Sequence, residues 1–432
     1  MRNLIIFFVG FFSLVNISLA QLEGQARIDS LLKELPKIKE DTNAVNLLSE
    51  LSFLYYSINP DKGIEFGNKG LKISGKINWK EGEAKCYSSL GVNYVGGKSD
   101  PSRALEYFTI ALKIDEKFGN IAGIARHLGN IGIIFENQSD YLKALEYYQK
   151  ALKIDEKLNN RAGIARHLGN IGLIYDYQAD YPKALEYHYK SLDIEKEMGN
   201  KPGISMSFAN IGIIYKNQSD YPKAIEYFHK ALKMDDEIAN KSGIASNLDN
   251  LGTIYTYQLD YPKALEYYHK ALKINEEIGN KFRIAVNLEN IGSVYFFLSQ
   301  DSTFENSEPI TQVFLNSDFY LNKSIELSEK ALKIYIEIGA IYNYSNLLHS
   351  LSESYKFKGN YKKAFEAFKE YKALQDSVFS MDKQKEIANL EAIRENELKD
   401  AEITILNTQK KAQQFQSYLL GGGAIVLLGA FW

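Results

Sequence analysis

The chain has 432 residues, and its apolar fraction of 45% and charged fraction of 24% are those of an ordinary folded protein. A formal net charge of −3 and the lack of a strongly basic block argue against nucleic acid as a partner. Cys86 is the only cysteine, which excludes an intrachain disulfide and a cysteine-based metal site.

The N-terminus has the pattern of an export signal. Arg2 precedes a short apolar run from Leu4 to Val15, and small residues at Ser18 and Ala20 are typical of a signal-peptidase site. The run is shorter than the roughly 20 residues that span a bilayer. We expect residues 1–20 to be a cleaved signal peptide, with an uncleaved anchor as the alternative. Residues 21–40 are predicted to form an N-terminal capping helix.

A repeat of forty residues fills the middle of the chain. Segments that begin at Gly123, Gly163, Gly203 and Gly243 share the pattern Gly-Ile-x-x-x-x-x-Asn-Ile/Leu-Gly. An aromatic residue follows three positions later, and then a segment of the form Asp-Tyr-Leu/Pro-Lys-Ala-Leu/Ile-Glu-Tyr. A fixed period of this length indicates a solenoid.

Each repeat predicts two helices. Apolar residues fall on one face of each helix, namely Leu128, Ile131 and Phe135 in the first and Ala144, Tyr148 and Ala151 in the second. A polar turn separates them. The last residue of each turn is a natural N-cap for the second helix, as at Asp140, Asp180, Asp220 and Asp260. Gly132 lacks a side chain where the partner helix would approach closely.

The order of large residue, glycine, aromatic, alanine, aromatic and alanine resembles the tetratricopeptide repeat (TPR) family, in its forty-residue, long-helix subclass. The residues that carry it are Leu128, Gly132, Phe135, Ala144, Tyr148 and Ala151. The resemblance implies an all-α solenoid of helical hairpins wound into a right-handed superhelix. Degenerate copies extend the pattern to about eight hairpins over residues 41–380, with an insertion at 299–318.

A charged segment follows the repeats. Residues 381–415 carry an apolar stripe at mixed spacings of eleven and seven, through Ile387, Leu398 and Ile405. This pattern predicts a coiled-coil-like helix and a possible homodimer. The alternative is a helix that packs back on the last repeat.

Residues 417–432 are uncharged and largely apolar, which predicts a C-terminal transmembrane segment. A helix of about 15 residues measures about 23 Å, which is less than the roughly 30 Å of a hydrocarbon core. We therefore expect an apparently truncated span whose natural reading frame continues further. The alternative is a complete protein with an abrupt membrane tail.

This order of segments resembles the periplasmic sensor region of bacterial TPR-containing transmembrane histidine kinases and nucleotide cyclases. The stretch from Lys385 to Glu391 looks like the helix before their membrane span. The resemblance implies an exported solenoid, anchored in the inner membrane, that binds a protein or peptide for signalling. Its output domain would be absent from this chain. The alternative is a membrane-tethered periplasmic scaffold for complex assembly, with no signalling role.

The TPR resemblance also implies a concave partner groove lined by the first helix of each hairpin. Carried onto this chain, the groove positions include Arg126, Asn130, Asn137, Arg166, Asn170, Tyr177, Asn210, Asn217, Asp249, Asn250, Tyr257, Glu289 and Asn290. The asparagines recur once per repeat and could hold a ligand backbone, or could simply bond a neighbouring helix.

The predicted groove changes its charge along its length. Arg126 and Arg166 are basic, whereas Asp249 and Glu289 are acidic, so a bound segment could be oriented by charge. Gly129 and Ile133 occupy the positions where relatives with a carboxylate clamp have lysine and asparagine, which argues against that mode of binding.

No motif for catalysis, phosphate binding or metal binding stands out in the sequence. The histidine pairs His127 and His167, and His229 and His269, are each forty residues apart and follow the repeat. We therefore expect no enzymatic activity, no cofactor and no metal in this chain.

Overall fold

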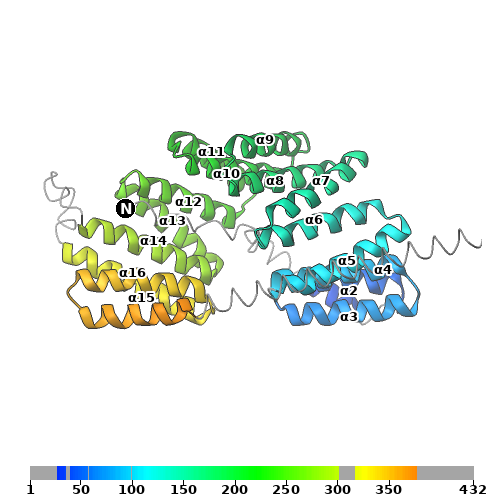
Figure 1. Ribbon diagram of the computed structural model, residues 1–432, viewed down its shortest axis with the longest axis horizontal. Coiled ribbons are helices and arrows are strands. Elements are labelled where there is room, and N and C mark those ends of the chain that lie inside the picture. The colour runs from blue at the N-terminus through cyan, green and yellow to red at the C-terminus, as the bar shows by residue number, and fades with distance from the viewer. Residues whose placement is uncertain (1–26, 36–38, 57, 99, 301–316, 377–432) are drawn as a thin grey trace, which may run out of the picture. The chain divides into compact units, whose positions relative to one another are not determined.

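The computed structural model describes residues 27–35, 39–56, 58–98, 100–300 and 317–376. The chain divides into two units, residues 1–374 and 375–432, and the helices below belong to the first unit apart from the last two residues of the final helix. Within the described ranges every regular element is a helix (Figure 1). A short helix over residues 27–34 comes first, and a helix over residues 361–376 comes last.

The helices between these two follow one another along the chain with short connections. In order, they are α2 (Thr42–Leu54), α3 (Pro60–Lys76), α4 (Lys80–Val92), the π-helical turn η2 (Asn93–Gly97), α5 (Pro101–Phe118), α6 (Ile121–Asn137), α7 (Tyr141–Lys157), α8 (Arg161–Tyr177), α9 (Tyr181–Glu197), α10 (Lys201–Asn217), α11 (Tyr221–Glu237), α12 (Lys241–Tyr257), α13 (Tyr261–Ile278), α14 (Lys281–Gln300), α15 (Ser317–Glu337) and α16 (Ile341–Phe357).

Consecutive helices pair into hairpins that pack in chain order (Figure 1). The first helix of a hairpin packs on its own partner, as α6 does on α7, and also on the helix before it. Counting the pair formed by α16 and the helix over residues 361–376, the described ranges hold eight hairpins. The prediction of an all-helical repeat arrangement is confirmed. Residues 301–316, most of the predicted insertion, lie outside the described residues.

The predicted N-caps of the second helices are confirmed. A carboxylate oxygen of Asp140 accepts a hydrogen bond from the backbone N–H of Lys143 at 3.2 Å, and Asp180, Asp220 and Asp260 cap their helices in the same way. Each cap satisfies a backbone donor that a helix N-terminus leaves free. Sequence reasoning missed a second set of caps at the first helices, in Asn120, Asn160 and Asn240.

The core of each hairpin consists of small and aromatic residues in close contact. Ala144, Tyr148 and Ala151 on α7 are fully buried, as predicted. A Cβ placed on Gly132 would lie 2.6 Å from Cε1 of Tyr148, which is closer than two non-bonded carbon atoms can approach. The missing side chain therefore allows α6 to pack against the tyrosine ring of α7, as the sequence predicted.

Three predicted segments cannot be compared with the structure. The signal peptide (1–20), the charged helix (381–415) and the transmembrane segment (417–432) all lie outside the described residues. Of the helices that the structure does describe, none combines the length and the apolar character needed to cross a membrane.

Candidate partner-binding face

The predicted groove residues lie on five first helices, α6, α8, α10, α12 and α14. We use the term first-helix face for the surface that these helices share, defined by the row of asparagines Asn130, Asn170, Asn210, Asn250 and Asn290 and by the predicted residues beside it. All five asparagines are half-buried. The ladder predicted from the repeat is thus a row of partly accessible amides, one on each helix.

Four of these amides have no partner in the described part of the chain. The exception is Asn250, whose amide nitrogen donates to the carbonyl oxygen of Ser246 at 3.0 Å and whose Oδ1 accepts from Nζ of Lys216 at 3.0 Å. The side chains of Asn130, Asn170, Asn210 and Asn290 hydrogen-bond to none of the described residues. The alternative explanation, that the asparagines bond to a neighbouring helix, therefore applies to Asn250 alone.

Two arginines lie on the same face, one helical turn before an asparagine. Arg126 precedes Asn130 by four residues and Arg166 precedes Asn170 by four, a spacing that places both members of a pair on one side of a helix. Both arginines are exposed. They form no ion pair with any described residue, whereas Arg161, at the start of α8, pairs with Glu197.

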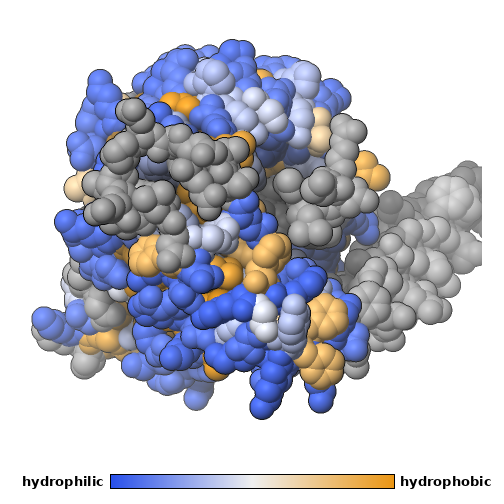
Figure 2. Space-filling view, turned by 90° about the vertical axis from the view of Figure 1, so that its left-hand side faces the viewer, coloured by the Kyte–Doolittle hydropathy of each residue, from blue (hydrophilic) through white to orange (hydrophobic). Residues whose placement is uncertain are grey.

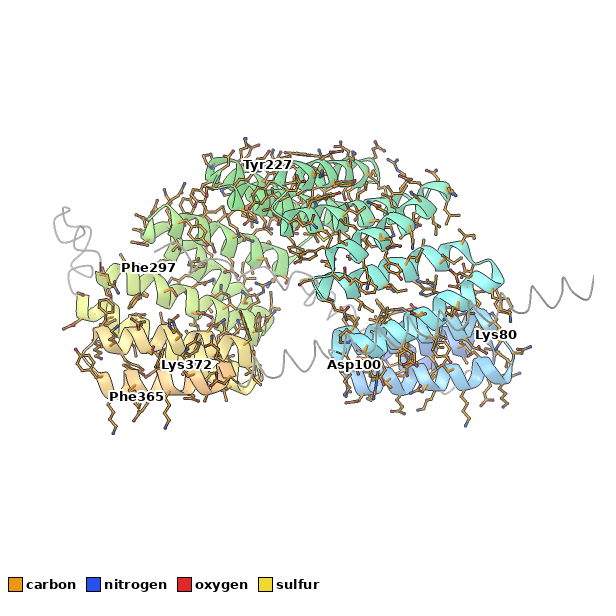
Figure 3. All side chains as sticks on the ribbon, viewed as in Figure 1. Lys80, Asp100, Tyr227, Phe297, Phe365 and Lys372 are labelled. Atoms are coloured by element: carbon orange, nitrogen blue, oxygen red, sulfur yellow. The ribbon has the colours of Figure 1, made fainter. Side chains whose placement is uncertain are left out.

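Aromatic rings border the face at the C-terminal ends of the first helices. Tyr177 stacks on Tyr141 with ring centroids 5.6 Å apart, and Tyr257 stacks on Tyr221 at 6.2 Å. Phe297, which holds the same repeat position on α14, is 44% exposed (Figure 3). The two remaining predicted residues at this level, Asn137 and Asn217, are exposed.

The acidic end of the predicted groove requires a correction. Asp249 is only 8% exposed, and it accepts a hydrogen bond from the amide of Asn287 on the next first helix. Glu289 accepts a hydrogen bond from the hydroxyl of Tyr335 on α15 at 2.7 Å. Burial raises the pKa of each carboxyl group to about 7. These two residues take part in packing between helices. The predicted groove therefore lacks the acidic end that was to contrast with the basic one.

A ladder of buried polar pairs joins several second helices to the first helix that follows each of them, and sequence reasoning missed it. Nε2 of His127 lies 2.9 Å from Oδ2 of Asp115, and the amide of Asn247 donates to Asp235 at 2.9 Å. His167 lies in the same way 3.1 Å from Asp155. The signal was present in the sequence, because Asp115, Asp155 and Asp235 occupy one position of the repeat.

Burial keeps these histidines neutral. It lowers the pKa of His127, and it lowers the pKa of His167 to about 4. Their forty-residue spacing is thus explained by packing between hairpins. In the described ranges, no group of three or more histidine, cysteine, aspartate or glutamate side chains could hold a metal ion.

Exposed apolar residues are prominent on the last described hairpin. Phe357 on α16, and Tyr361 and Phe365 on the helix that follows, are all more than half exposed. Figure 2 shows one side of the molecule as mainly hydrophilic, with hydrophobic residues gathered in separate patches. In a repeat protein each hairpin packs against its neighbours, and no further hairpin follows this one in the described ranges.

Comparison with known families matches the repeats directly. The tetratricopeptide repeat model matches residues 123–197 and 203–277, and the Sel1 repeat model matches residues 84–113. No curated protein sequence matches the chain.

Several solved structures share the fold. A signal transduction ATPase with a tetratricopeptide repeat sensor from Pyrococcus horikoshii has 17% identity and a TM-score of 0.56 over 85% of this chain and 55% of that one. Aspartyl phosphate phosphatase F from Bacillus subtilis has 13% identity and a TM-score of 0.52 over 85% and 96%. A Rap protein complexed with competence and sporulation factor has 15% identity and a TM-score of 0.50 over 83% and 99%. At these identities the likeness concerns the fold alone.

Proposed function

We propose that this chain, which carries tetratricopeptide repeats in a helical solenoid, is a protein-binding module. It holds an extended peptide segment of its partner on the first-helix face. The observation that carries this proposal is the row of four half-buried asparagine amides that no described residue satisfies. They are Asn130, Asn170, Asn210 and Asn290.

An asparagine amide suits the backbone of a peptide. It offers two N–H donors and a carbonyl acceptor, and an extended peptide presents free N–H and C=O groups along its length. First helices of successive hairpins contact each other, as α8 does α10 and α10 does α12. Packed helices lie about 8–10 Å apart and an extended chain advances about 3.3 Å per residue, so one amide would meet about every third peptide residue.

The structural neighbours support a protein or peptide as the partner. One of them is complexed with competence and sporulation factor, and another carries its repeats as the sensor of an ATPase. These ligands and roles belong to those proteins. The fold that they share with this chain makes a peptide the first class of ligand to test.

The test is a peptide selection with the full chain. Random-sequence peptides displayed on phage are selected against the wild-type protein, and the affinities of the recovered peptides are then measured by fluorescence anisotropy. A variant with Asn130, Asn170, Asn210 and Asn290 all changed to alanine should bind at least about tenfold more weakly, because each lost amide removes hydrogen bonds to the ligand.

A matched control uses the second helices. Lys150, Lys190 and Lys270 are exposed there, and Lys230 holds the same repeat position. Changing all four to alanine should leave the affinity within about twofold. Equal losses in both variants, or selection of no peptide at all, would overturn the proposal.

In its finer form, the proposal makes the chain the binding region of a membrane-anchored bacterial signalling protein. This form of the proposal includes export through residues 1–20, a periplasmic location and an inner-membrane anchor at residues 417–432. All three rest on the sequence pattern. N-terminal sequencing of the mature protein should find Gln21 first, and the protein should stay with inner membranes during alkaline extraction. A signalling role further predicts a transcriptional or second-messenger change when the gene is deleted, whereas a tethered scaffold predicts none.

A further inference from the structure

We infer that the peptide held on the first-helix face carries two acidic side chains, which Arg126 and Arg166 bind at the α6–α8 end of the face. This inference rests on the proposed function and adds to it the chemistry and the direction of the ligand.

The two arginines are placed to act together. They occupy the same position in consecutive hairpins, each on the side of its helix that carries a ladder asparagine. Their helices are in direct contact, because a Cβ placed on Gly129 of α6 would lie 2.6 Å from Cε1 of His167 on α8. His167 is the next residue after Arg166. One peptide that crosses from α6 to α8 can therefore meet both guanidinium groups.

Both guanidinium groups are free to bind a carboxylate. Only eight of the 51 basic residues in the chain are arginines. Three of the others in the described ranges have an acidic partner: Arg27 lies 2.7 Å from Glu50, Arg103 lies 3.4 Å from Asp100, and Arg161 pairs with Glu197. Arg126 and Arg166 are exposed and form no ion pair with any described residue.

The buried carboxylates that face His127 and His167, the residues next to the two arginines, are already engaged. Asp115 is buried, accepts a hydrogen bond from the amide of Asn120 at 3.0 Å and lies 2.9 Å from Nε2 of His127. Asp155 accepts in the same way from Asn160 at 2.9 Å. The charge that Arg126 and Arg166 present to the surface is therefore not cancelled by these carboxylates.

At the repeat position of Arg126 and Arg166, basic residues occur only at this end of the face. At the same position of the next hairpins the chain has Met206, which is 60% exposed, then the buried Ser246 and the half-buried Val286. A peptide with acidic residues near one end would therefore bind in one direction. Arginine forms paired hydrogen bonds with a carboxylate, and with helices about 8–10 Å apart the two acidic residues would lie two to four positions apart.

The test measures sequence preference. Random peptides with amidated C-termini are selected against wild-type protein and against a variant with Arg126→Gln and Arg166→Gln, and acidic pairs two to four positions apart are counted. The wild-type protein should enrich such pairs. For a recovered acidic peptide, the double variant should bind at least about tenfold more weakly, and the loss should shrink as salt rises. The same peptide with its acidic residues changed to amides should bind both proteins equally.

A control variant with Lys150→Gln and Lys190→Gln removes the same charge from the second helices. It should keep the acidic preference. If peptides are selected without acidic enrichment, or if the double arginine variant keeps the preference, the inference is wrong while the proposed function stands. A preference that appears only for peptides with a free C-terminal carboxylate also overturns it. If no peptide is selected, both fail.

Discussion

Asp249 and Glu289 occupy the same position of the repeat. Unlike the exposed acidic residues of the chain, each has its carboxyl group buried between helices. The hydrogen bonds from Asn287 and Tyr335 do not offset the cost of removing each charge from water, and the pKa of each rises to about 7. A carboxyl group with a higher pKa in the folded than in the unfolded protein binds more protons when folded. Such a group lowers stability as pH rises from about 4 to about 7.

We therefore predict that Asp249→Asn stabilises the protein at pH 8. The carboxamide keeps an acceptor for Asn287 and carries no charge, so the free energy of unfolding at pH 8 should increase by about 1–3 kcal/mol, with a smaller increase at pH 5. Thermal denaturation at both pH values measures this. The exposed Asp236→Asn is the control. A stabilisation that is equal at the two pH values would show that burial of the charge is not its cause.

The residue scale also shows what the sequence could and could not predict. The repeat placed Asn130 and its equivalents on the first helices, and the structure leaves four of the five without a described partner. The repeat pattern could not show that Asp249 is buried. The equivalent residues in other repeats are glycine and alanine, so they do not indicate how a charged side chain would be placed there. Asp249 is buried in contact with Asn287, a residue of the following hairpin.

At the scale of the helices, two glycines on first helices have different surroundings. A Cβ on Gly132 would meet the ring of Tyr148 at 2.6 Å, whereas a Cβ on Gly169 would meet only the Oγ of Ser191, at 3.7 Å. Gly132→Ala should destabilise the protein by about 1–3 kcal/mol through overpacking. Gly169→Ala should stabilise it by up to about 1 kcal/mol, because alanine favours the helix. Urea denaturation of both variants measures the change in the free energy of unfolding. A change of the same sign in both would contradict this difference in packing.

The turn between the two helices of a hairpin contains a residue with a strained backbone, which the sequence pattern did not reveal. Ala179 and Leu259 have φ of 57° and 60°, in the left-handed region that favours glycine. The backbone N–H of the next residue bonds to the helix, as Asp180 does to the carbonyl of Tyr175 at 2.9 Å, which holds this conformation. Ala179→Gly and Leu259→Gly should each stabilise the protein by about 0.5–1 kcal/mol.

Thermal denaturation tests these turn variants, with the helix-interior Ala184→Gly as a control that should destabilise. Destabilisation by both turn glycines would show that the left-handed conformation carries no strain. Glycine occupies the corresponding turn of the last described hairpin at Gly359, with φ of 75°, and illustrates the conformation that the substitutions would favour. The sequence pattern placed these turns correctly, but alanine and leucine at these positions did not reveal the backbone conformation.

At the scale of the whole molecule, hairpins make their contacts with neighbours in the chain. Stability in such a protein is a sum of local terms, and a local defect has local effects. We predict that Gly132→Ala speeds amide hydrogen exchange in α6 and α7 and leaves α12 and α13 unchanged. Hydrogen-exchange mass spectrometry resolves these segments. Uniform acceleration along the chain would instead indicate one cooperative unit.

The forty-residue period was sufficient to predict the helices, their pairing and the caps of the second helices, because each depends on residues close in the sequence. The polar pairs between hairpins, such as Asp115 with His127, depend on which helices meet. The predicted signal peptide, charged helix and membrane segment lie outside the described residues and remain predictions.

Photo-crosslinking locates a bound peptide on the first-helix face most directly. Met206 on α10 is 60% exposed on that face, and Glu226 on α11 is exposed on a second helix. Each is replaced in turn by benzoylphenylalanine, and a selected peptide is added before irradiation. We predict a peptide adduct from position 206 and none from position 226. An adduct at position 226 without one at position 206 would place the partner on the second helices and contradict it.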